Sequence, residues 1–586
     1  MDTLIEHEVL PEAEISQRAT TGANTGIAVA TAAAALTATV LVACGGGGSS
    51  GGGDTGTGGG TGTGGGTGGT PVAPTTMEAS RFLAQGSMGA SRDGIARVQA
   101  LGYAAWIDEQ FALPASTGRW ESLVAGGFDA VANKNSEAGF DACAWRKLLA
   151  SPDTLRQRVT LALSEIMVVS IDSLVGGGWK AFAAANYLDL LEANAFGNYR
   201  TLMGAISTST AMGMYLTFRA SKKADPVTGA LPDENYAREL MQLFTIGLVQ
   251  LNLDGTAKLT GGVATATYTL ADITGLAPVF TGWDFDLAGQ AAAAATATPD
   301  FIRRPMVQIA GRYETAAKTF LGTTIAVNTP AEQALAMALD TLFAHANIAP
   351  FVSRQLIQRL VASNPSPAYV ARVAGVFLKD GSGTKGNLRA VIKAILLDDE
   401  ARGAAGLAST TAGKLREPML RFTGWARAWK AGSASDAWSI GNTSDPSTRL
   451  AQSPLRSPSV FNFFRPGYVP PNSPIATAGL VAPEFQINNE SSVVGTVNYL
   501  QRAMSGLGVG DLVADYTPLL TLADDSAALT AEINLVLAGG QLSAATVATI
   551  STAVATLATG TDALRLKRIY AALTLAIAAP EFVVLK

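Results

Sequence analysis

Hydrophobic and polar residues alternate most regularly between Asp233 and Gly247. At about 100° per residue, the polar side chains share one half of a helical wheel: Glu234, Asn235, Arg238, Glu239, Gln242 and Thr245. The apolar side chains share the other half: Tyr236, Ala237, Leu240, Met241, Leu243 and Phe244. Asp233 can cap the first turn, and Gly247 can end the helix in the left-handed conformation. The pattern predicts an amphipathic helix over 233–246, with Glu234–Arg238 and Asn235–Glu239 as pairs four residues apart.

This helix admits two interpretations. In the commoner one, its polar face is a salt-bridged outer surface. In the other, the polar face looks into a cleft, where Arg238 holds a carboxylate or phosphate and Glu239 serves as a base or ligand. Helical periodicity is the same in both cases, so it does not decide between them.

The helical pattern continues through most of the chain from Met77. It predicts helices bounded by proline or glycine, among them 153–170, 183–195, 330–345, 350–363, 367–379, 385–398 and 414–431. A short strand is expected within 263–269, and 454–483, rich in proline and aromatic residues, is expected to be an ordered loop over the helices. The predicted fold is mainly α, a large multi-helix globular domain with little β-structure. We place a main helical domain at 77–500 and a C-terminal helical region packed on it at 501–586.

The first 76 residues differ in composition from the remainder. Residues 26–43 are small and apolar, which is typical of the hydrophobic part of an export signal, although the preceding segment has little positive charge. Leu41-Val42-Ala43-Cys44 resembles the lipobox of bacterial lipoproteins, whose cysteine is acylated. Residues 45–70 are almost entirely Gly, Thr and Ser and are expected to form a disordered, flexible tether. This predicts an export signal at 1–43, then lipid attachment at Cys44 and a tether over 44–76.

A single membrane-spanning anchor is the alternative to lipidation. The apolar run is short and rich in alanine, which argues against a permanent span. Both interpretations place the remainder outside the cytoplasm. Gly45, rather than aspartate, follows the cysteine, and by analogy with enterobacterial lipoproteins this favours the outer membrane. We therefore expect an exported cell-envelope protein, held to a membrane by its lipid anchor, in which Cys143 forms no internal disulfide.

The composition excludes several kinds of site. The chain has 2 histidines and 2 cysteines, so neither a multi-histidine zinc site nor a cysteine-ligated cluster is expected. A divalent cation held by carboxylates stays open, with Asp284 and Asp286 as candidate ligands. His345 lies between two predicted helices, where a hydrogen-bonded cap is favoured over catalysis. The net charge of −5 and the lack of a basic run argue against nucleic-acid binding. The glycine tract lacks the Lys-Ser/Thr ending of a phosphate loop.

Besides helix 233–246, several short blocks follow one another along the chain: 79–85, 155–159, 211–216, 280–283, 351–357, 363–367, 415–418, 457–464 and 479–485. In this order they resemble a bacterial family catalogued as domain of unknown function 1800, and the resemblance covers residues 77 to 586. The resemblance implies an exported, mostly helical protein. Members often occur beside genes for domain of unknown function 1501, which resembles sulfatases and alkaline phosphatases, so it also implies a sulfatase-like partner. It carries over no catalytic residue. Where many members have His-Asp, this chain has Tyr313-Glu314.

Two functions follow from these observations. The first is a lipid-anchored envelope protein that binds or supports an exported partner, because the chain has a tether and no known catalytic motif. The second is an exported hydrolase that acts on an envelope or extracellular polymer. Its site would be Glu234, Asn235, Arg238 and Glu239, with Arg354 or Glu417 opposite, since paired carboxylates can run acid–base hydrolysis without histidine. The sequence identifies no cofactor.

Overall fold

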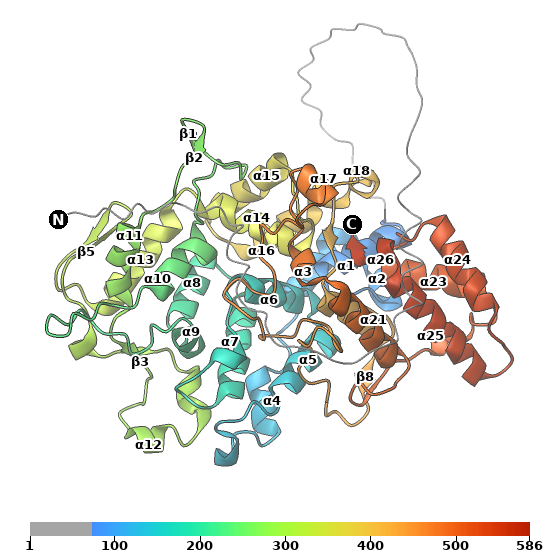
Figure 1. The fold of residues 1–586 in the computed structure, drawn as a ribbon, viewed down its shortest axis with the longest axis horizontal. Coiled ribbons are helices and arrows are strands. Elements are labelled where there is room, and N and C mark those ends of the chain that lie inside the picture. Colours follow the sequence, from blue (N-terminus) through green and yellow to red (C-terminus); the bar gives the residue numbers. More distant parts are fainter. Residues whose placement is uncertain (1–72) are drawn as a thin grey trace, which may run out of the picture. The chain divides into compact units, whose positions relative to one another are not determined.

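In the computed structural model, residues 73–586 are described (Figure 1). The predictions for the export signal, Cys44 and most of the tether therefore lie outside the described residues. Within 73–586, helices dominate and every sheet is a pair of short antiparallel strands. This confirms the prediction of a mainly α fold with little β-structure.

The first part of the described chain is a series of helices with polar caps. Thr75 begins the first helix with a capping box, in which its side chain and that of Glu78 each accept the other residue's backbone N–H. Ser91 and Asn198 cap later helices in the same region. The helices are α1 (Thr76–Gly86), α2 (Arg92–Leu101), α3 (Tyr103–Ala112), α4 (Arg119–Ala125), α5 (Phe140–Ala150), α6 (Thr154–Ile166), α7 (Lys180–Asn194), α8 (Tyr199–Ser207) and α9 (Thr210–Tyr215).

The middle of the chain mixes helices with short hairpins. The strand expected within 263–269 is reduced to a two-residue hairpin strand, whose side chains are exposed. The helices are α10 (Asn235–Glu239), the π-helix η3 (Leu240–Thr245), α11 (Leu270–Leu276), α12 (Ala292–Ala295), α13 (Ala331–Ala344), α14 (Ile348–Leu360), α15 (Pro367–Leu378), α16 (Leu388–Leu397), α17 (Asp399–Arg402) and α18 (Ala404–Ala408). The strands are β1 (Leu259–Thr260), β2 (Val263–Ala264), β3 (Trp283–Asp284), β4 (Val307–Gln308), β5 (Lys318–Phe320) and β6 (Thr323–Ile325).

The last part contains the predicted proline-rich loop and the C-terminal helices. Residues 454–483 have irregular structure with one short helix, α20 (Pro474–Thr477). The other helices are α19 (Pro418–Ala428), α21 (Glu490–Met504), α22 (Thr517–Leu520), α23 (Ser526–Ala538), α24 (Ala544–Ala555), α25 (Asp562–Ala578) and α26 (Pro580–Val583). The strands are β7 (Lys414–Leu415), β8 (Gly432–Ser433), β9 (Leu512–Val513) and β10 (Val584–Leu585).

Two hydrophobic clusters form the core of the described residues. The larger one joins α1 to α16 around residues such as Phe82, Trp106 and Tyr236. The second joins α5 and α19 to the helices from α21 to α25, with Trp145 and Trp425 fully buried. The predicted boundary between 500 and 501 falls inside α21, whose side chains belong to this second cluster.

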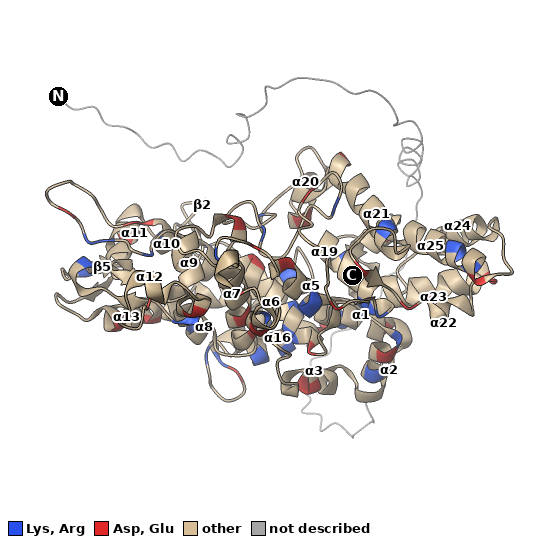
Figure 2. Cartoon of the chain, turned by 90° about the horizontal axis from the view of Figure 1, so that it is seen from below, with Lys and Arg blue, Asp and Glu red and all other residues tan. Residues whose placement is uncertain are grey.

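The ends of the described chain lie together. Figure 1 shows α1 beside α23, and the Ser80 hydroxyl donates to the Val536 carbonyl over 3.3 Å. β10 pairs with β7, which places the C-terminus against residues 414–415. Acidic and basic residues are interspersed along the helices in Figure 2. Between 73 and 586 no individual helix has the length and apolarity of a membrane span. Only α13 and α14 together meet that test, and they are bent by 76°.

Candidate functional site

The helix predicted over 233–246 is present, but its geometry changes after Glu239. α10 is α-helical, whereas the next six residues, η3, are π-helical. In a π-turn the N–H bonds the carbonyl five residues earlier, as that of Ile246 does to Met241 over 3.0 Å. The wider turn rotates the later side chains away from the ideal wheel. Thr245, expected on the polar face, is therefore buried, and Leu243, expected on the apolar face, is half-buried.

Side chains of neighbouring helices hold the π-turn in place. Its last carbonyls would otherwise lack donors, because the helix stops there. The donors are the Gln355 amide to Leu243 (3.2 Å), the Tyr199 hydroxyl to Phe244 (2.6 Å) and the Asn347 amide to Ile246 (2.9 Å). As predicted, Gly247 ends the helix in the left-handed conformation, with φ of 70°.

The first turn is organised by short polar contacts. As predicted, the Asp233 carboxylate accepts a free N–H of the first turn, that of Asn235, over 2.8 Å, although the N-cap position itself is Glu234. The Glu234–Arg238 pair forms at 3.6 Å, and Glu234 also accepts the Thr274 hydroxyl over 2.8 Å. The predicted Asn235–Glu239 pair does not form, because the Asn235 amide turns towards Thr217, 3.5 Å away.

Glu239 stands at the junction between α10 and η3. The residue is only 7% exposed, and its buried Oε2 has no hydrogen-bond partner among the described residues. Burial raises its pKa, and Arg238 offsets only part of this effect. Burial also raises the pKa of Tyr215 and of Tyr268 to about 12, with a smaller contribution from Glu239. An unpaired carboxyl at a π-turn is a costly arrangement of the kind that occurs at functional sites.

Arg354 and Glu417, the predicted partners of this face, lie on other elements. Arg354 is on α14, and burial alone lowers its pKa. Glu417 is fully buried immediately before α19. Within 73–586, no hydrogen bond or ion pair joins either residue to Glu234, Asn235, Arg238 or Glu239.

Glu417 belongs instead to a buried ionic cluster. Its carboxylate lies 3.0 Å from the Lys414 ammonium, which is also 3.0 Å from Glu484. The Gln452 amide donates to Glu417 over 2.9 Å, and Glu165 pairs with Arg359 at 3.7 Å. With Arg158 the ionic cluster holds three carboxylates and three cations, each at most 4% exposed: Glu165, Glu417, Glu484, Arg158, Arg359 and Lys414.

Within the ionic cluster, the pKa values of two carboxyls are shifted in opposite directions. Burial and the charge of Glu417 raise the pKa of Glu165 well above its usual range. Burial acts in the same direction on Glu417, but Lys414, hydrogen bonding from Glu165 and Arg158 lower its pKa overall. The two pKa values therefore shift in opposite directions, as those of neighbouring buried carboxyls do.

The two aspartates considered as cation ligands are bound by arginines. Asp284 accepts Arg219 over 2.9 Å and Arg312 over 2.7 Å. Asp286 lies 3.3 Å from Arg304. In the part of the chain that the structure describes, no group of three or more His, Cys, Asp or Glu side chains is arranged to hold a metal ion. The arginines supply the positive charge that neutralises these aspartates.

His345 and Cys143 both have structural roles in the described chain. His345 accepts the N–H of Asn347 at Nδ1 over 3.1 Å, the hydrogen-bonded corner expected from the sequence. Cys143 is buried, and burial raises the pKa of its thiol to about 12. Because the thiolate is the reactive form, Cys143 is not activated as a nucleophile at neutral pH.

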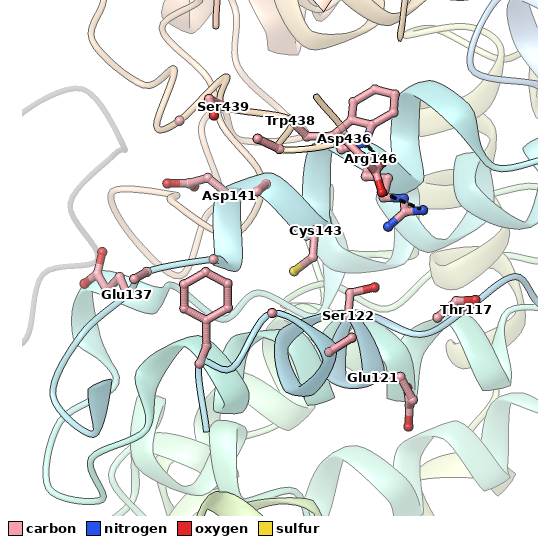
Figure 3. A pocket seen from close by; sticks show the side chains of 18 of the residues that line it. Thr117, Glu121, Ser122, Glu137, Asp141, Cys143, Arg146, Asp436, Trp438 and Ser439 are labelled. Atoms are coloured by element: carbon pink, nitrogen blue, oxygen red, sulfur yellow. Dashed lines mark hydrogen bonds and ion pairs between the residues drawn. The ribbon is translucent and has the colours of Figure 1, made fainter. Parts of the chain in front are cut away.

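A large cavity of about 980 Å³ opens between α4, α5 and the loop 436–441 (Figure 3). We call it the Trp438 pocket. Glu121 and Ser122 on α4 lie across the cavity from Trp438 and Ser439, with Cys143 of α5 between them. This volume is at the upper end of the range of small-molecule sites, about 300–1,000 Å³.

Charges around the Trp438 pocket are mostly paired. Arg456 holds Asp141 with two hydrogen bonds of 3.1 and 3.0 Å and reaches Glu137 over 3.0 Å. Asp436 accepts the Trp438 indole N–H over 2.8 Å. Glu121 is exposed and forms no ion pair within 73–586, so its carboxylate is free to accept hydrogen bonds from a ligand.

The loop that carries Trp438 is held in place by the carboxylate of Asp511, which lies next to strand β9. Asp511 accepts the Ser433 hydroxyl (2.5 Å) and the backbone N–H and hydroxyl of Ser435 (2.9 and 2.6 Å). Ser433 then accepts the N–H of Trp438 over 2.9 Å. These bonds fix Asp436 and Trp438 at positive φ, 59° and 48°. Such conformations cost about 1–3 kcal/mol for ordinary residues and persist where the surroundings impose them, often at functional sites.

The family model described as Protein of unknown function (DUF1800) matches residues 81–584. The chain belongs to this family. No curated protein and no solved structure matches it.

The blocks by which the sequence resembles DUF1800 meet at the ionic cluster. Arg158, Glu417 and Glu484 come from the blocks 155–159, 415–418 and 479–485. The block 457–464 lines a small cavity beside Glu165 and Gln452. Segments far apart in the DUF1800 sequence are thus joined by buried charges, which the sequence alone did not indicate.

Tyr313, at the position where the resemblance led us to expect histidine, is a packed side chain. It is 5% exposed, and its hydroxyl donates to the Thr329 carbonyl over 3.2 Å. The Lys318 ammonium lies 4.6 Å from the ring centre. Burial raises the Tyr313 pKa to about 12, so the phenol stays protonated at neutral pH.

Proposed function

We propose that this protein is an exported, lipid-anchored envelope protein that binds a saccharide segment of an envelope or extracellular polymer in the Trp438 pocket. The size and composition of this pocket carry the proposal. A cavity of about 980 Å³ accommodates a ligand of several sugar rings. Trp438 and Phe128 supply apolar faces, while Glu121 and Ser122 supply hydrogen-bonding groups. Sugar rings need both kinds of surface, because they have apolar faces and hydroxyl edges.

Trp438→Ala in the full-length chain tests this proposal. We expect at least a tenfold loss of affinity for oligosaccharides of envelope polymers, about 1.4 kcal/mol, because one wall of the pocket is removed. Isothermal titration calorimetry measures the change. Because Trp438 is largely buried, Glu121→Gln provides a second variant, whose exposed side chain can change without loss of packing.

Phe485→Ala is the matched control, since this aromatic side chain is 37% exposed and does not line the pocket. Its affinity for the same oligosaccharides should equal that of the wild type. If Trp438→Ala and Glu121→Gln, both folded, also bind like the wild type, the saccharide site is not the Trp438 pocket.

A second candidate function is hydrolysis of the same class of polymer. The observation that favours it is the raised pKa of Glu239. A carboxyl with a raised pKa can act as a general acid near neutral pH. Its neighbours Arg238 on α10 and Gln242 on η3 are both half-buried and therefore partly accessible. Release of reducing sugar ends by the wild type, abolished in Glu239→Gln, would support this function. Unchanged release in Glu239→Gln would remove Glu239 from it.

The predicted membrane anchor and partner belong to the same proposal. Acylation of Cys44 would hold the body near the membrane, and an exported sulfatase-like protein would act on the bound polymer. Metabolic labelling with a fatty acid, compared between the wild type and Cys44→Ser, tests the anchor. Co-purification from envelope extracts tests the partner.

A further inference from the structure

A second, smaller cavity lies on the other side of the loop that carries Trp438. Its volume is about 220 Å³, and it is enclosed by the turn 439–449, helix α21 and the glycine-rich loop 506–510. Its polar side chains are Ser439, Thr448, Arg449, Tyr499 and Arg502. The volume suits a small polar group rather than a drug-sized ligand.

Two arginines supply its charge. The Arg449 guanidinium donates to the Asn442 carbonyl over 2.7 Å, and that of Arg502 donates to the Thr448 carbonyl over 2.9 Å. Within the described residues, neither guanidinium forms an ion pair with a carboxylate. Each arginine has five N–H donors, so both keep donors for a ligand.

The nearest acids along the chain are engaged elsewhere. Asp445 accepts hydrogen bonds from Ser447 and Thr448, and Asp511 accepts them from Ser433 and Ser435. Neither aspartate lines the cavity. Its charge is therefore positive, which excludes a metal cation as the occupant.

Tyr499 gives an independent sign of a ligand. The residue is 3% exposed, and its hydroxyl has no hydrogen-bond partner among residues 73–586. Burial raises its pKa, and Arg449 and Arg502 act against this, so both cations lie near the phenol oxygen. A buried hydroxyl normally has a partner, and here the cavity is where one would lie.

The glycine loop contributes backbone donors. Gly506, Gly508 and Gly510 have φ of 69°, 83° and 56°. A Cβ at position 510 would lie 2.6 Å from the Ser439 carbonyl oxygen, so glycine is needed there. In the described structure, the amide hydrogens of Gly508, Val509 and Gly510 meet no protein acceptor. Alternating left-handed residues with free amides form concave sites for anions.

We propose that this cavity binds a tetrahedral oxyanion, a phosphate or sulfate group, either free or as a monoester. Arg449 and Arg502 would neutralise its charge through charge-assisted hydrogen bonds. The Tyr499 hydroxyl and the amides of the glycine loop would donate to its remaining oxygens. Ser439 lines both this cavity and the Trp438 pocket, so the two sites share a wall. The oxyanion site does not depend on the proposed saccharide function.

Calorimetric titration of the full-length protein tests the proposal. The ligands are inorganic phosphate, inorganic sulfate, glucose 6-phosphate and glucose 6-sulfate, with chloride at matched ionic strength as the background. We expect saturable binding of at least one oxyanion, weakened at least tenfold by combined Arg449→Gln and Arg502→Gln substitution. Tyr499→Phe removes a single oxygen and should weaken binding severalfold. Tighter binding of the sugar esters would identify a monoester site, and equal binding a site for the free anion.

Arg389→Gln is the matched control, because this arginine is exposed and does not line the cavity. Its affinity for the oxyanions should match that of the wild type. Failure of all four ligands to bind the wild type would overturn the proposal. So would unchanged affinity in both Tyr499→Phe and the double arginine variant. If the double variant does not fold, Tyr499→Phe against the wild type decides the outcome.

Discussion

At the scale of single residues, Glu239 is buried in the fold although the helical pattern places it on the polar face. On the helical wheel it lies at the edge of the polar face, about 80° from the centre of that face. The fold buries it at the start of the π-turn and gives its Oε2 no partner in the described chain. Its charge is therefore a cost to stability, in contrast to the paired carboxylate of Glu234.

We predict that Glu239→Gln raises stability at pH 7 by about 1 kcal/mol, because an amide is cheaper to bury unpaired than a carboxylate. Thermal and urea unfolding measure the effect. Glu234→Gln on the same helix is the control, and it should lose about 0.2–0.5 kcal/mol with its ion pair. A clear loss of stability in Glu239→Gln would mean that the charge is paired in solution.

The raised pKa of Glu239 also predicts that the stability of the protein depends on pH. The folded pKa of Glu239 is raised, so the native state binds more protons than the unfolded state above about pH 4.3. Wild-type stability should fall as pH rises from there through the raised pKa. This part of the slope should be missing in Glu239→Gln, which unfolding curves between pH 4 and 8 would reveal.

At the scale of elements, the loop 433–441 separates the Trp438 pocket from the proposed oxyanion site. Its shape depends on Asp511, next to strand β9, through the bonds to Ser433 and Ser435. These bonds lower the pKa of Asp511. The loop is thus ordered by bonds among its own residues and by a residue 76 positions after Ser435.

We predict that Asp511→Ala loosens this loop while leaving the helical core folded. Proteolytic cleavage within 433–441 should become at least tenfold faster, because hydrogen bonds that impose the strained conformation are lost. Oligosaccharide affinity should fall with it. Asp515→Ala is the control, since that carboxylate bonds the N–H of Thr517 and not the loop. Equal cleavage rates for both variants would contradict the role of Asp511.

At the scale of the whole molecule, the ionic cluster joins segments from 158 to 484 in one buried network. It places three basic side chains beside three acidic ones, and buried charges are tolerated in a core where they are paired. Such a network contributes little net stability compared with apolar packing, but breaking one partner is costly.

We predict that Glu417→Gln destabilises the protein by about 3 kcal/mol. The substitution removes a negative charge that pairs with a buried cation, and the cation then stays buried without that partner. Urea unfolding measures this against Glu490→Gln, an exposed glutamate, whose effect should stay within about 0.5 kcal/mol. The pKa of Glu417 is lowered, so its contribution is present at neutral pH and is lost as pH falls below about 4.3. The variant should therefore lose less stability on acidification than the wild type does.

The sequence by itself determined the class of fold and the local signals at the two ends of helix 233–246, while other predicted helices, such as 153–170 and 414–431, are shorter in the structure. Periodicity, caps and glycine depend on residues close in the chain, and the structure confirms the mainly α fold, the Asp233 hydrogen bond in the first turn and the left-handed Gly247. The DUF1800 membership followed from short blocks in order. One feature of the sequence is local to the oxyanion site, the alternating glycines 506, 508 and 510. Nothing in the sequence around its two arginines indicates that they lie together.

Tertiary structure alone decided which charges meet. Arg354 and Glu417 were expected opposite helix 233–246, yet in the described chain no hydrogen bond or ion pair joins either residue to its polar side chains. Asp284 and Asp286 meet arginines that periodicity could not place beside them. The π-turn likewise depends on donors from α8 and α14 and from Asn347. Local sequence specifies the direction of a side chain on its own helix, but its partners depend on long-range packing.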